Sequence, residues 1–330
     1  MSAAATDDTN PATMRAVVQD AFGGPEVLRL KEVARPKPLP TEVLVRVHAA
    51  GVNPVDWKTR AGSGMAGVLG QPPFVLGWDV SGVVEAVGFG VTTLAVGDEV
   101  YGMPWFPRSA GGYAEYVAAP ARQFARKPAS VDHVHAAAVP LAALTAWQAV
   151  VDTAQVQRGQ RVLITAAAGG VGHFAVQFAR HLGAHVVATA SAARHPWLKE
   201  LGADETVDYS TTRFEDVIRD VDVVIELVGD THDGSSTRSL KVLRPGGLLV
   251  AVPEGVSPEL AQAAEAAGVR VTPFLVEPDG AALTTIAGLI DAGEVAVEVE
   301  QTFPLDQAGA AHARGEAGRT RGKLVLTTAN

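Results

Sequence analysis

The sequence contains no cysteine among its 330 residues. Disulfide bonds and thiolate metal sites are therefore excluded. Nine histidines remain as candidate ligands, but they do not group with carboxylates at the spacing that a metal site requires. Seven of them are either scattered or stand at the start of an apolar helical segment: His48, His133, His135, His173, His181, His185 and His195. We expect these side chains to be solvated or helix-start residues, and we expect no metal.

An excess of positive charge is also missing, because 27 Lys and Arg stand against 36 Asp and Glu, which gives a net charge of -9. Nucleic-acid binding needs clustered positive charge, so we expect no nucleic-acid partner. No apolar run approaches the roughly 20 residues that span a bilayer. Residues Met1–Asp8 lack the basic start and apolar centre of a secretory signal. We therefore expect no membrane partner and a cytoplasmic protein.

Short apolar segments bounded by glycine or proline fill the first part of the chain. They are Met14–Gln19, Glu42–His48, Gly77–Gly88 and Gly97–Gly102. Short strands at regular intervals with turn signals between them predict a small, β-rich, barrel-like domain. The residues up to about Thr13 have the composition of a disordered tail.

The pattern changes after Pro140, where Leu141–Val151 has helical spacing. Apolar strands then alternate with helices, which predicts a doubly wound parallel sheet. The strands are Arg161–Thr165, His185–Ala190, Val221–Ile225, Leu248–Val252 and Val269–Pro273. Further strands at Gly293–Thr302 and Gly322–Thr328 suggest that the end of the chain rejoins the first domain. Two domains with a cleft between them suit a chain of this length.

A glycine turn joins the first of these strands to a helix over Phe174–Leu182. The turn reads Ala167-x-Gly169-x-x-Gly172, with alanine at the first of three positions that often hold glycine. A strand, a glycine turn and a helix N-terminus together present free backbone N–H groups to a diphosphate. We therefore expect Ala168, Gly169, Gly170, Val171 and Gly172 to bind a dinucleotide.

The next strand ends without the acidic residue that usually binds a free ribose 2′-hydroxyl. Thr189, Ala190 and Ser191 stand there instead, and Arg194 follows. A hydroxyl and a guanidinium both suit a 2′-phosphate, so these residues favour NADPH over NADH. Tyr209 could also contact that phosphate. The alternatives are a solvated surface charge for Arg194 and an ordinary strand-end side chain for Tyr209.

Eight motifs along the chain resemble the medium-chain dehydrogenase/reductase superfamily, in its zinc-free quinone oxidoreductase-like branch. They are Gly51–Lys58, Leu76–Val84, Gly97–Tyr101, Gly111–Tyr116, Ala138–Trp147, Ala167–Gly172, Leu243–Gly247 and Gly322–Val325. The resemblance implies a GroES-like substrate domain over residues 14–137, to which residues 275–330 return. It also implies a Rossmann NADPH-binding domain over residues 138–274.

Zinc members of the superfamily carry a cysteine and a His-Glu pair where this chain has Asn53, Trp78 and Asp79. The resemblance therefore implies hydride transfer without zinc, from NADPH to a quinone or to the activated C=C bond of an α,β-unsaturated carbonyl. A biosynthetic enoyl reductase and an NADPH-binding protein with little turnover remain alternatives. A short-chain reductase is disfavoured, because no tyrosine has a lysine four residues later. Relatives of this kind are often homodimers, which we also expect here.

The resemblance also implies roles for single residues. Asn53, Asp56 and Lys58 are the catalytic candidates, and Lys58 would stabilise an enolate or donate a proton unless it is an ordinary solvated lysine. Trp57, Met65 and Trp78 could wall an apolar pocket, although a core role suits Trp78 at least as well, and Tyr113 suits a core. The remaining residues implied in cofactor binding are Asn53, Pro54, Thr145, Val228, Gly229, Val252, Pro253, Phe274, Leu275, Val276 and Lys323.

Overall fold

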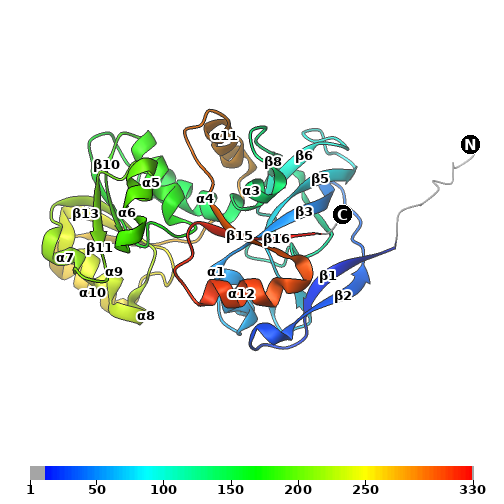
Figure 1. Ribbon diagram of the computed structural model, residues 1–330, viewed down its shortest axis with the longest axis horizontal. Coiled ribbons are helices and arrows are strands. Elements are labelled where there is room, and N and C mark those ends of the chain that lie inside the picture. Colours follow the sequence, from blue (N-terminus) through cyan, green and yellow to red (C-terminus); the bar gives the residue numbers. More distant parts are fainter. Residues whose placement is uncertain (1–11, 329–330) are drawn as a thin grey trace, which may run out of the picture.

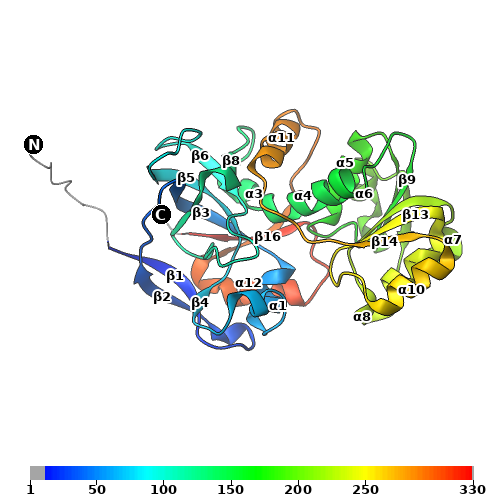
Figure 2. The same cartoon turned by 180° about the vertical axis from the view of Figure 1, so that it is seen from behind.

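The computed structural model describes residues 12–328, so most of the predicted tail lies outside the described residues. Thr13 begins the first strand, β1 (Thr13–Gln19). The chain forms two lobes side by side, each built on its own sheet (Figure 1). Seen from behind, helix α4 (Pro140–Trp147) lies between the lobes (Figure 2).

One lobe contains a six-stranded parallel sheet in the order β11-β10-β9-β12-β13-β14. Its strands are β9 (Arg161–Ile164), β10 (His185–Ala190), β11 (Glu205–Asp208), β12 (Val221–Glu226), β13 (Leu243–Ala251) and β14 (Arg270–Pro273). Val162 and Ile164 pack into one core, and Leu163 packs into a second. Alternate residues of a strand point to opposite faces, so the continuous apolar run in β9 reflects burial on both faces of the sheet.

Helices cover both faces of this sheet. One core includes residues of α4 and α5, and the other includes residues of α7 and α10. The helical elements of this lobe are α4, α5 (Gly172–His181), α6 (His195–Leu201), α7 (Phe214–Val217), α8 (Asp230–Asp233), α9 (Ser235–Ser239), α10 (Pro258–Ala267), and the turns η3 (Gln148–Thr153), η4 (Ala192–Arg194) and η5 (Leu240–Val242). Ser257 caps α10 through the N–H of Leu260, and Gly268 ends it in the left-handed conformation.

The other lobe is β-rich. Its seven-stranded sheet has the order β15-β16-β3-β5-β6-β8, with β7 paired to β3, and a small sheet has the order β2-β1-β4. The strands are β2 (Leu28–Ala34), β3 (Glu42–Val52), β4 (Phe74–Val75), β5 (Asp79–Val87), β6 (Glu99–Gly102), β7 (Tyr116–Pro120), β8 (Phe124–Arg126), β15 (Val299–Pro304) and β16 (Lys323–Thr327). Since β16 pairs with β3, the end of the chain rejoins the first lobe, as the sequence predicts.

The helical elements of the β-rich lobe are short, apart from two near the end of the chain. They are η1 (Pro25–Val27), α1 (Pro54–Arg60), α2 (Ala66–Leu69), η2 (Ala121–Gln123), α3 (His133–Ala137), α11 (Gly280–Asp291), η6 (Leu305–Gln307) and α12 (Ala308–Glu316). No helix within residues 12–328 is both long and apolar enough to cross a membrane.

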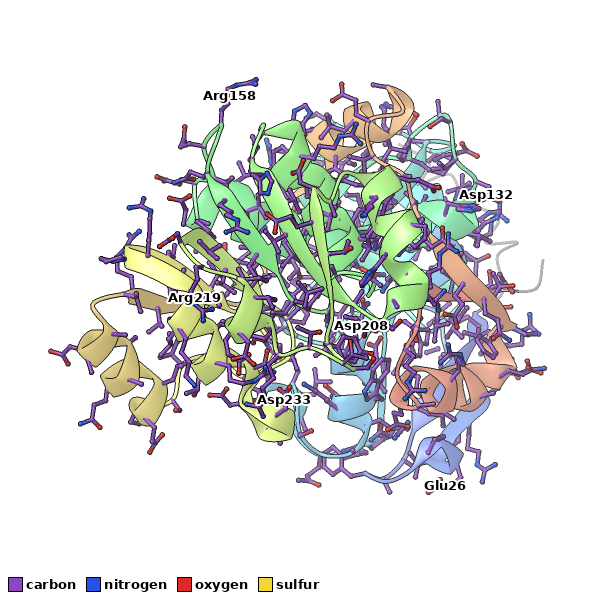
Figure 3. All side chains as sticks on the ribbon, turned by 60° about the vertical axis from the view of Figure 1, so that its left-hand side comes forward. Glu26, Asp132, Arg158, Asp208, Arg219 and Asp233 are labelled. Carbon is purple, nitrogen blue, oxygen red and sulfur yellow. The ribbon has the colours of Figure 1, made fainter. Side chains whose placement is uncertain are left out.

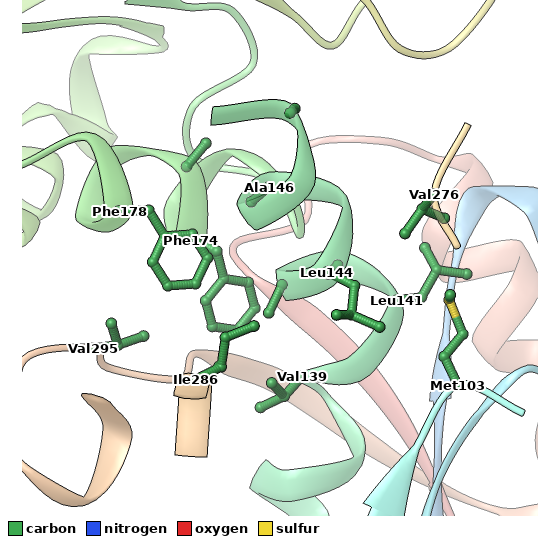
Figure 4. Packing of buried hydrophobic residues seen from close by; sticks show 14 of the residues in the cluster. Met103, Val139, Leu141, Leu144, Ala146, Phe174, Phe178, Val276, Ile286 and Val295 are labelled. Carbon is green, nitrogen blue, oxygen red and sulfur yellow. The ribbon is translucent and has the colours of Figure 1, made fainter. Parts of the chain in front are cut away.

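Aromatic and aliphatic side chains join the helices at the boundary of the lobes. Phe174 and Phe178 of α5 pack beside Leu144 of α4 and Ile286 of α11 (Figure 4). Many charged side chains instead lie on the outside, where Glu26, Asp132 and Arg158 point away from the protein (Figure 3). The two lobes therefore share one continuous core, which fixes the walls of the space between them.

The predicted combination of a doubly wound parallel sheet with a β-rich barrel-like domain is confirmed. The domain boundaries stay a prediction. One strand begins later than expected, because β15 starts at Val299 and not at Gly293. Strands β2 and β11 are not apparent in the sequence, since both are half-exposed or exposed edge strands with many polar residues.

Candidate functional site

A cavity of about 450 Å³ lies between the two lobes, beside the carboxyl ends of β9, β12, β13 and β14. Ligands of open α/β sheets bind at this end of the strands. The β-rich lobe contributes residues of α1, the loop that follows it and β16. Of the predicted site residues, those lining the cavity are Asn53, Pro54, Lys58, Thr145, Gly169, Gly170, Val171, Gly172, Val228, Val252, Pro253, Phe274, Leu275, Val276 and Lys323.

The glycine turn forms one wall of this cavity. A Cβ atom on Gly172 would lie 2.5 Å from the carbonyl oxygen of Ala166, so only glycine lets α5 start this close to the strand. The positive φ of the turn falls on Ala166 (46°) and not on Ala167, so alanine is accommodated at the first position of the motif. Ala168 is absent from the lining of the cavity and instead accepts a hydrogen bond from the N–H of Gly322 (3.0 Å).

The end of β10 lies beside the turn. Thr189 is buried, and its hydroxyl oxygen accepts a hydrogen bond from the N–H of Ala166 (3.2 Å). Neither Thr189 nor the buried Ala190 lines the cavity. Thr189 and Ala190 are placed to support the glycine turn from behind the cavity wall. Their contact with the cofactor stays a prediction.

Three further residues predicted at the adenosine end also lie outside the cavity: Ser191, Arg194 and Tyr209. Arg194 donates a hydrogen bond to the carbonyl oxygen of Arg319 (3.5 Å), and Tyr209 is 55% exposed. Arg319 itself lines the cavity and is not apparent from the sequence. The contact brings it next to Arg194 across a sequence separation of 125 residues.

The loop after β12 is shaped by two carboxylates. Glu226 is buried and accepts hydrogen bonds from the N–H groups of Val228 (3.0 Å) and Gly229 (2.9 Å). Glu254 accepts from the N–H of Asp230 (2.8 Å). A Cβ atom on Gly229 would lie 2.4 Å from Glu254 Cδ, and the φ of Gly229 is +89°. Gly229 therefore supports the cavity wall beside Val228 without lining the cavity itself.

Buried polar groups form the floor of the cavity. Asn53 donates a hydrogen bond from Nδ2 to Asp79 Oδ2 (2.8 Å), and Lys323 Nζ donates to Asn53 Oδ1 and to the carbonyl oxygen of Val52 (2.7 Å). The same ammonium lies 3.6 Å from Asp79 Oδ2. Burial raises the pKa of Asp79, and the Lys323 ammonium acts in the opposite direction. Lys323 is thus held beneath the cavity, with its stem 2.9 Å from where a Cβ of Gly170 would lie.

Asp56 lies behind this floor and does not reach the cavity. Its Oδ2 atom accepts hydrogen bonds from the N–H of Asn53 (2.7 Å) and the hydroxyl of Tyr113 (2.9 Å). Burial raises the pKa of Asp56 to about 7, and these two hydrogen bonds act in the opposite direction. The direct catalytic role predicted for Asp56 stays a prediction. The hydrogen bonds that Asp56 makes are those expected of a residue that anchors the start of α1.

A chain of polar side chains continues from Asp56 to α12. Arg60 has only N–H donors, so the His312 Nδ1 atom that faces it at 3.2 Å is an acceptor. His312 Nε2 then carries the proton and donates to the hydroxyl oxygen of Tyr113 (3.1 Å), which donates to Asp56. This series of hydrogen bonds joins α1 to α12. It does not conduct protons, because the arginine at its end does not release its proton.

The exposed Lys58 lies at the edge of the cavity, and Trp57, Met65 and Phe106 line its apolar part. Trp78 is 1% exposed, and its indole N–H donates to the carbonyl oxygen of Arg108 (2.6 Å). The core role expected for Trp78 and Tyr113 agrees with their burial.

The histidines are more varied than the sequence suggests. His173 is fully buried and is the second residue of α5, so of the two expected options it is a helix-start residue and not a solvated one. His133 is the first residue of α3, which Asp132 caps. Within residues 12–328, no group of three or more His, Cys, Asp or Glu side chains is placed to hold a metal ion.

Comparisons with known proteins agree with this architecture. Residues 39–129 match the family described as alcohol dehydrogenase GroES-like domain, and residues 201–326 match the family described as zinc-binding dehydrogenase. The chloroplastic NADPH-dependent alkenal/one oxidoreductase of Arabidopsis thaliana is 34% identical, over 97% of this chain and 81% of its own length. The GroES-like nature of the β-rich lobe is thereby confirmed.

Solved structures give the same result. The quinone oxidoreductase from Coxiella burnetii is 36% identical and superposes with a TM-score of 0.88, over 96% of this chain and 99% of its own. A mycobacterial protein whose structure was solved in complex with NADPH is 33% identical, with a TM-score of 0.83, over 95% of this chain and 99% of its own.

Proposed function

The chain belongs to the medium-chain dehydrogenase/reductase superfamily, in its zinc-free quinone oxidoreductase-like branch, and from this we propose that it is an NADPH-dependent reductase of quinones or of the activated C=C bond in α,β-unsaturated carbonyls. One observation supports this most directly. The glycine turn of one lobe and the Asn53–Lys58 segment of the other line the same cavity. A dinucleotide on the turn would therefore extend toward an acceptor held by the β-rich lobe.

The residues of the cavity fit a dinucleotide. Gly169, Gly170 and Gly172 line it without side chains, and α5 begins at the turn. The N–H of His173 is bonded to the carbonyl oxygen of Gly169 (3.1 Å), but the first N–H groups of a helix in general lack partners within the helix and are available as donors. These donors suit a diphosphate. When bound, NADPH supplies a hydride from C4 of its nicotinamide ring. We assign support of the nicotinamide end to Thr145, Val252, Phe274 and Val276, which also line the cavity.

The adenosine end favours a 2′-phosphate. Strand β10 does not itself end in an acidic residue, and Ser191 and Arg194 follow it, while Asp208 of the neighbouring β11 is paired with Ala190 at its end. Arg319 lines the cavity, and its carbonyl oxygen accepts a hydrogen bond from Arg194, so it brings a second arginine to this region. We assign these three groups to the phosphate, because guanidinium and hydroxyl donors form strong hydrogen bonds with phosphate oxygens. Tyr209 is exposed and follows the end of β11, which is paired with the end of β10, and we propose it as a further contact.

The β-rich lobe would hold the acceptor. Trp57, Met65 and Phe106 give that part of the cavity an apolar wall, which suits an enone or quinone ring. Negative charge develops on the carbonyl oxygen as the β-carbon accepts hydride, and the α-carbon then takes up a proton. Groups at the cavity edge that donate to the oxygen lower the barrier. Lys58 is the cationic group of α1 that lines the cavity.

We expect Lys58→Met to lower kcat about 10-fold while leaving the KM for NADPH unchanged, because it removes one cationic donor near the acceptor and none at the glycine turn. Steady-state kinetics with a fixed enone and varied NADPH measure both constants. Lys199→Met, an exposed lysine on α6 away from the cavity, is the control. An unchanged kcat in Lys58→Met would mean that Lys58 is an ordinary solvated lysine.

The proposed activity is tested by mixing the protein with NADPH and following the loss of NADPH absorbance with a panel of quinones, alkenals and cyclic enones. Turnover with one of these acceptors is the expected result. If NADPH binds but no acceptor on the panel is reduced, the protein is either a reductase of a specialised substrate or a binder with little turnover, and the proposed acceptor class is wrong.

We further propose that the protein is cytoplasmic and forms a homodimer through β14. This strand ends the six-stranded sheet, and within residues 12–328 it pairs with β13 alone. An unpaired edge can be extended by the same edge of a second copy. Light scattering during size-exclusion chromatography should give twice the mass of 34.2 kDa. A monomer mass at micromolar concentration would contradict the dimer.

A further inference from the structure

Asp79 is a buried carboxylate that neither reaches the cavity nor has a role in the mechanism above. It is fully buried, whereas its partners Asn53, Lys323 and Leu141 all line the cavity. Asp79 Oδ1 accepts a hydrogen bond from the N–H of Leu141 at the start of α4 (2.6 Å). Its Oδ2 atom faces Asn53 and Lys323. One carboxylate thus holds groups from α4, β16 and the residue before α1.

The partners of Asn53 fix which way its amide points. The ammonium of Lys323 carries only donors, so the atom of Asn53 that meets it is the oxygen Oδ1. The carboxylate of Asp79 has only acceptors when ionised, so the atom 2.8 Å from it is the nitrogen Nδ2. A rotation of the amide by 180° would place oxygen against carboxylate and nitrogen against ammonium. Both contacts are buried, which makes the wrong orientation costly.

This orientation leaves one N–H of Asn53 for a ligand. Nδ2 carries two N–H groups, and among the described residues one acceptor is paired with it, the carboxylate of Asp79. Asn53 lines the cavity, as do Trp57 and Lys58 of the helix that it precedes. The second N–H is therefore a rigid, neutral donor at the cavity floor, which suits an oxygen that becomes negative during a reaction.

We propose that Asp79 is a positioning residue, which together with Lys323 fixes the amide of Asn53 so that its second N–H donates to the carbonyl oxygen of the bound acceptor. The proposal rests on the proposed reductase function, since it assigns a donor to that reaction. Loss of one such donor typically lowers kcat about 100-fold or more.

Two variants and a control separate this role from a purely structural one. Asp79→Asn places an amide N–H group or a neutral oxygen where Asn53 and Lys323 need a carboxylate, so we expect lower stability and a kcat about 100-fold lower. The double variant Asn53→Asp, Asp79→Asn exchanges the two side chains and keeps the net charge. The carboxylate that it introduces at position 53 can accept hydrogen bonds from Lys323 and from the new amide at position 79, so we expect most of the thermal stability to return.

The double variant has no side-chain N–H at position 53, so its kcat should stay about 100-fold below that of the wild type. Asp20→Asn, which replaces an exposed aspartate outside the lining of the cavity, is the control. We expect it to keep the wild-type kcat.

The measurements are the thermal midpoint, the KM and kcat for one enone, and the dissociation constant of a saturated ketone analogue in the presence of NADP+. Restored stability without restored kcat supports the proposal. Recovery of kcat in the double variant would overturn it, as would a wild-type kcat in Asp79→Asn, or a double variant no more stable than Asp79→Asn.

If the wild-type protein reduces no acceptor, the proposed function fails, and binding of the ketone analogue then tests the donor. About 10-fold weaker binding of the analogue to the double variant supports the donor, and equal binding overturns it.

Discussion

Replacing Gly172 with valine is expected to raise the dissociation constant of NADPH at least about 100-fold, which corresponds to roughly 2.7 kcal/mol. A Cβ atom at this position would lie 2.5 Å from the carbonyl oxygen of Ala166 and 2.6 Å from the Cα of Ala167. Backbone atoms cannot move aside as a flexible side chain can, so the whole turn must shift. Two or more charge-assisted hydrogen bonds from the turn to the diphosphate would then be lost, which accounts for an effect of this size.

Fluorescence titration with NADPH measures this constant, and Gly288→Ala in α11 is the matched control. A Cβ on Gly288 meets no other atom within 4 Å, so this variant should bind NADPH as the wild type does. Circular dichroism of Gly172→Val shows whether the fold persists. A folded Gly172→Val variant with wild-type affinity would mean that the diphosphate is not held by this turn.

Stability is expected to fall in acid, and His173 should account for about 3 kcal/mol of the loss between pH 6.5 and pH 4. Burial lowers the pKa of His173 from 6.5 to about 4, and its hydrogen bond with the carbonyl oxygen of Gly169 acts in the opposite direction. The unfolded chain therefore binds a proton on this residue at a higher pH than the folded chain does. The stabilisation is complete above pH 6.5 and is lost as the pH falls toward 4.

Urea denaturation of the wild type and of His173→Phe at several pH values measures this contribution. His312, whose pKa burial lowers to about 3, changes stability in the same direction, and Asp56 in the opposite direction. Both remain in the variant, so the difference between the two proteins isolates His173. An unchanged pH dependence of the free energy of unfolding in His173→Phe would contradict the account.

The parts of this structure that follow from local sequence are predicted well. The apolar run in β9, the glycines of the turn and the helical spacing of α5 lie within 22 residues of one another, from Arg161 to Leu182. Strand ends also follow from the sequence, because the carboxyl ends of parallel strands meet at one edge of the sheet. Val228, Val252 and Phe274 are for this reason found at the cavity.

Contacts between distant segments are not predictable in this way. Lys323 meets Asn53 across 270 residues, and Arg60 meets His312 across 252. A single sequence gives each of these polar residues only an average preference for the surface, whereas the fold buries them together and pairs their hydrogen-bonding groups. Arg319 is not apparent from the sequence for the same reason. One signal could have indicated Arg319: it is a cationic residue three positions before Gly322, and the N–H of Gly322 donates to the carbonyl oxygen of Ala168 in the glycine turn.

The central claim is that the protein transfers a hydride from NADPH to a conjugated acceptor. The most direct measurement uses NADPH with both hydrogens at C4 of the nicotinamide replaced by deuterium, a series of cyclic enones, and mass spectrometry or NMR of the product, with NADH labelled in the same way in parallel. The account predicts deuterium in the product, at the β-carbon of an enone, and slower turnover with NADH. Absence of deuterium from the product of every acceptor would contradict hydride transfer. Equal rates with NADH would contradict the role assigned to Ser191, Arg194 and Arg319.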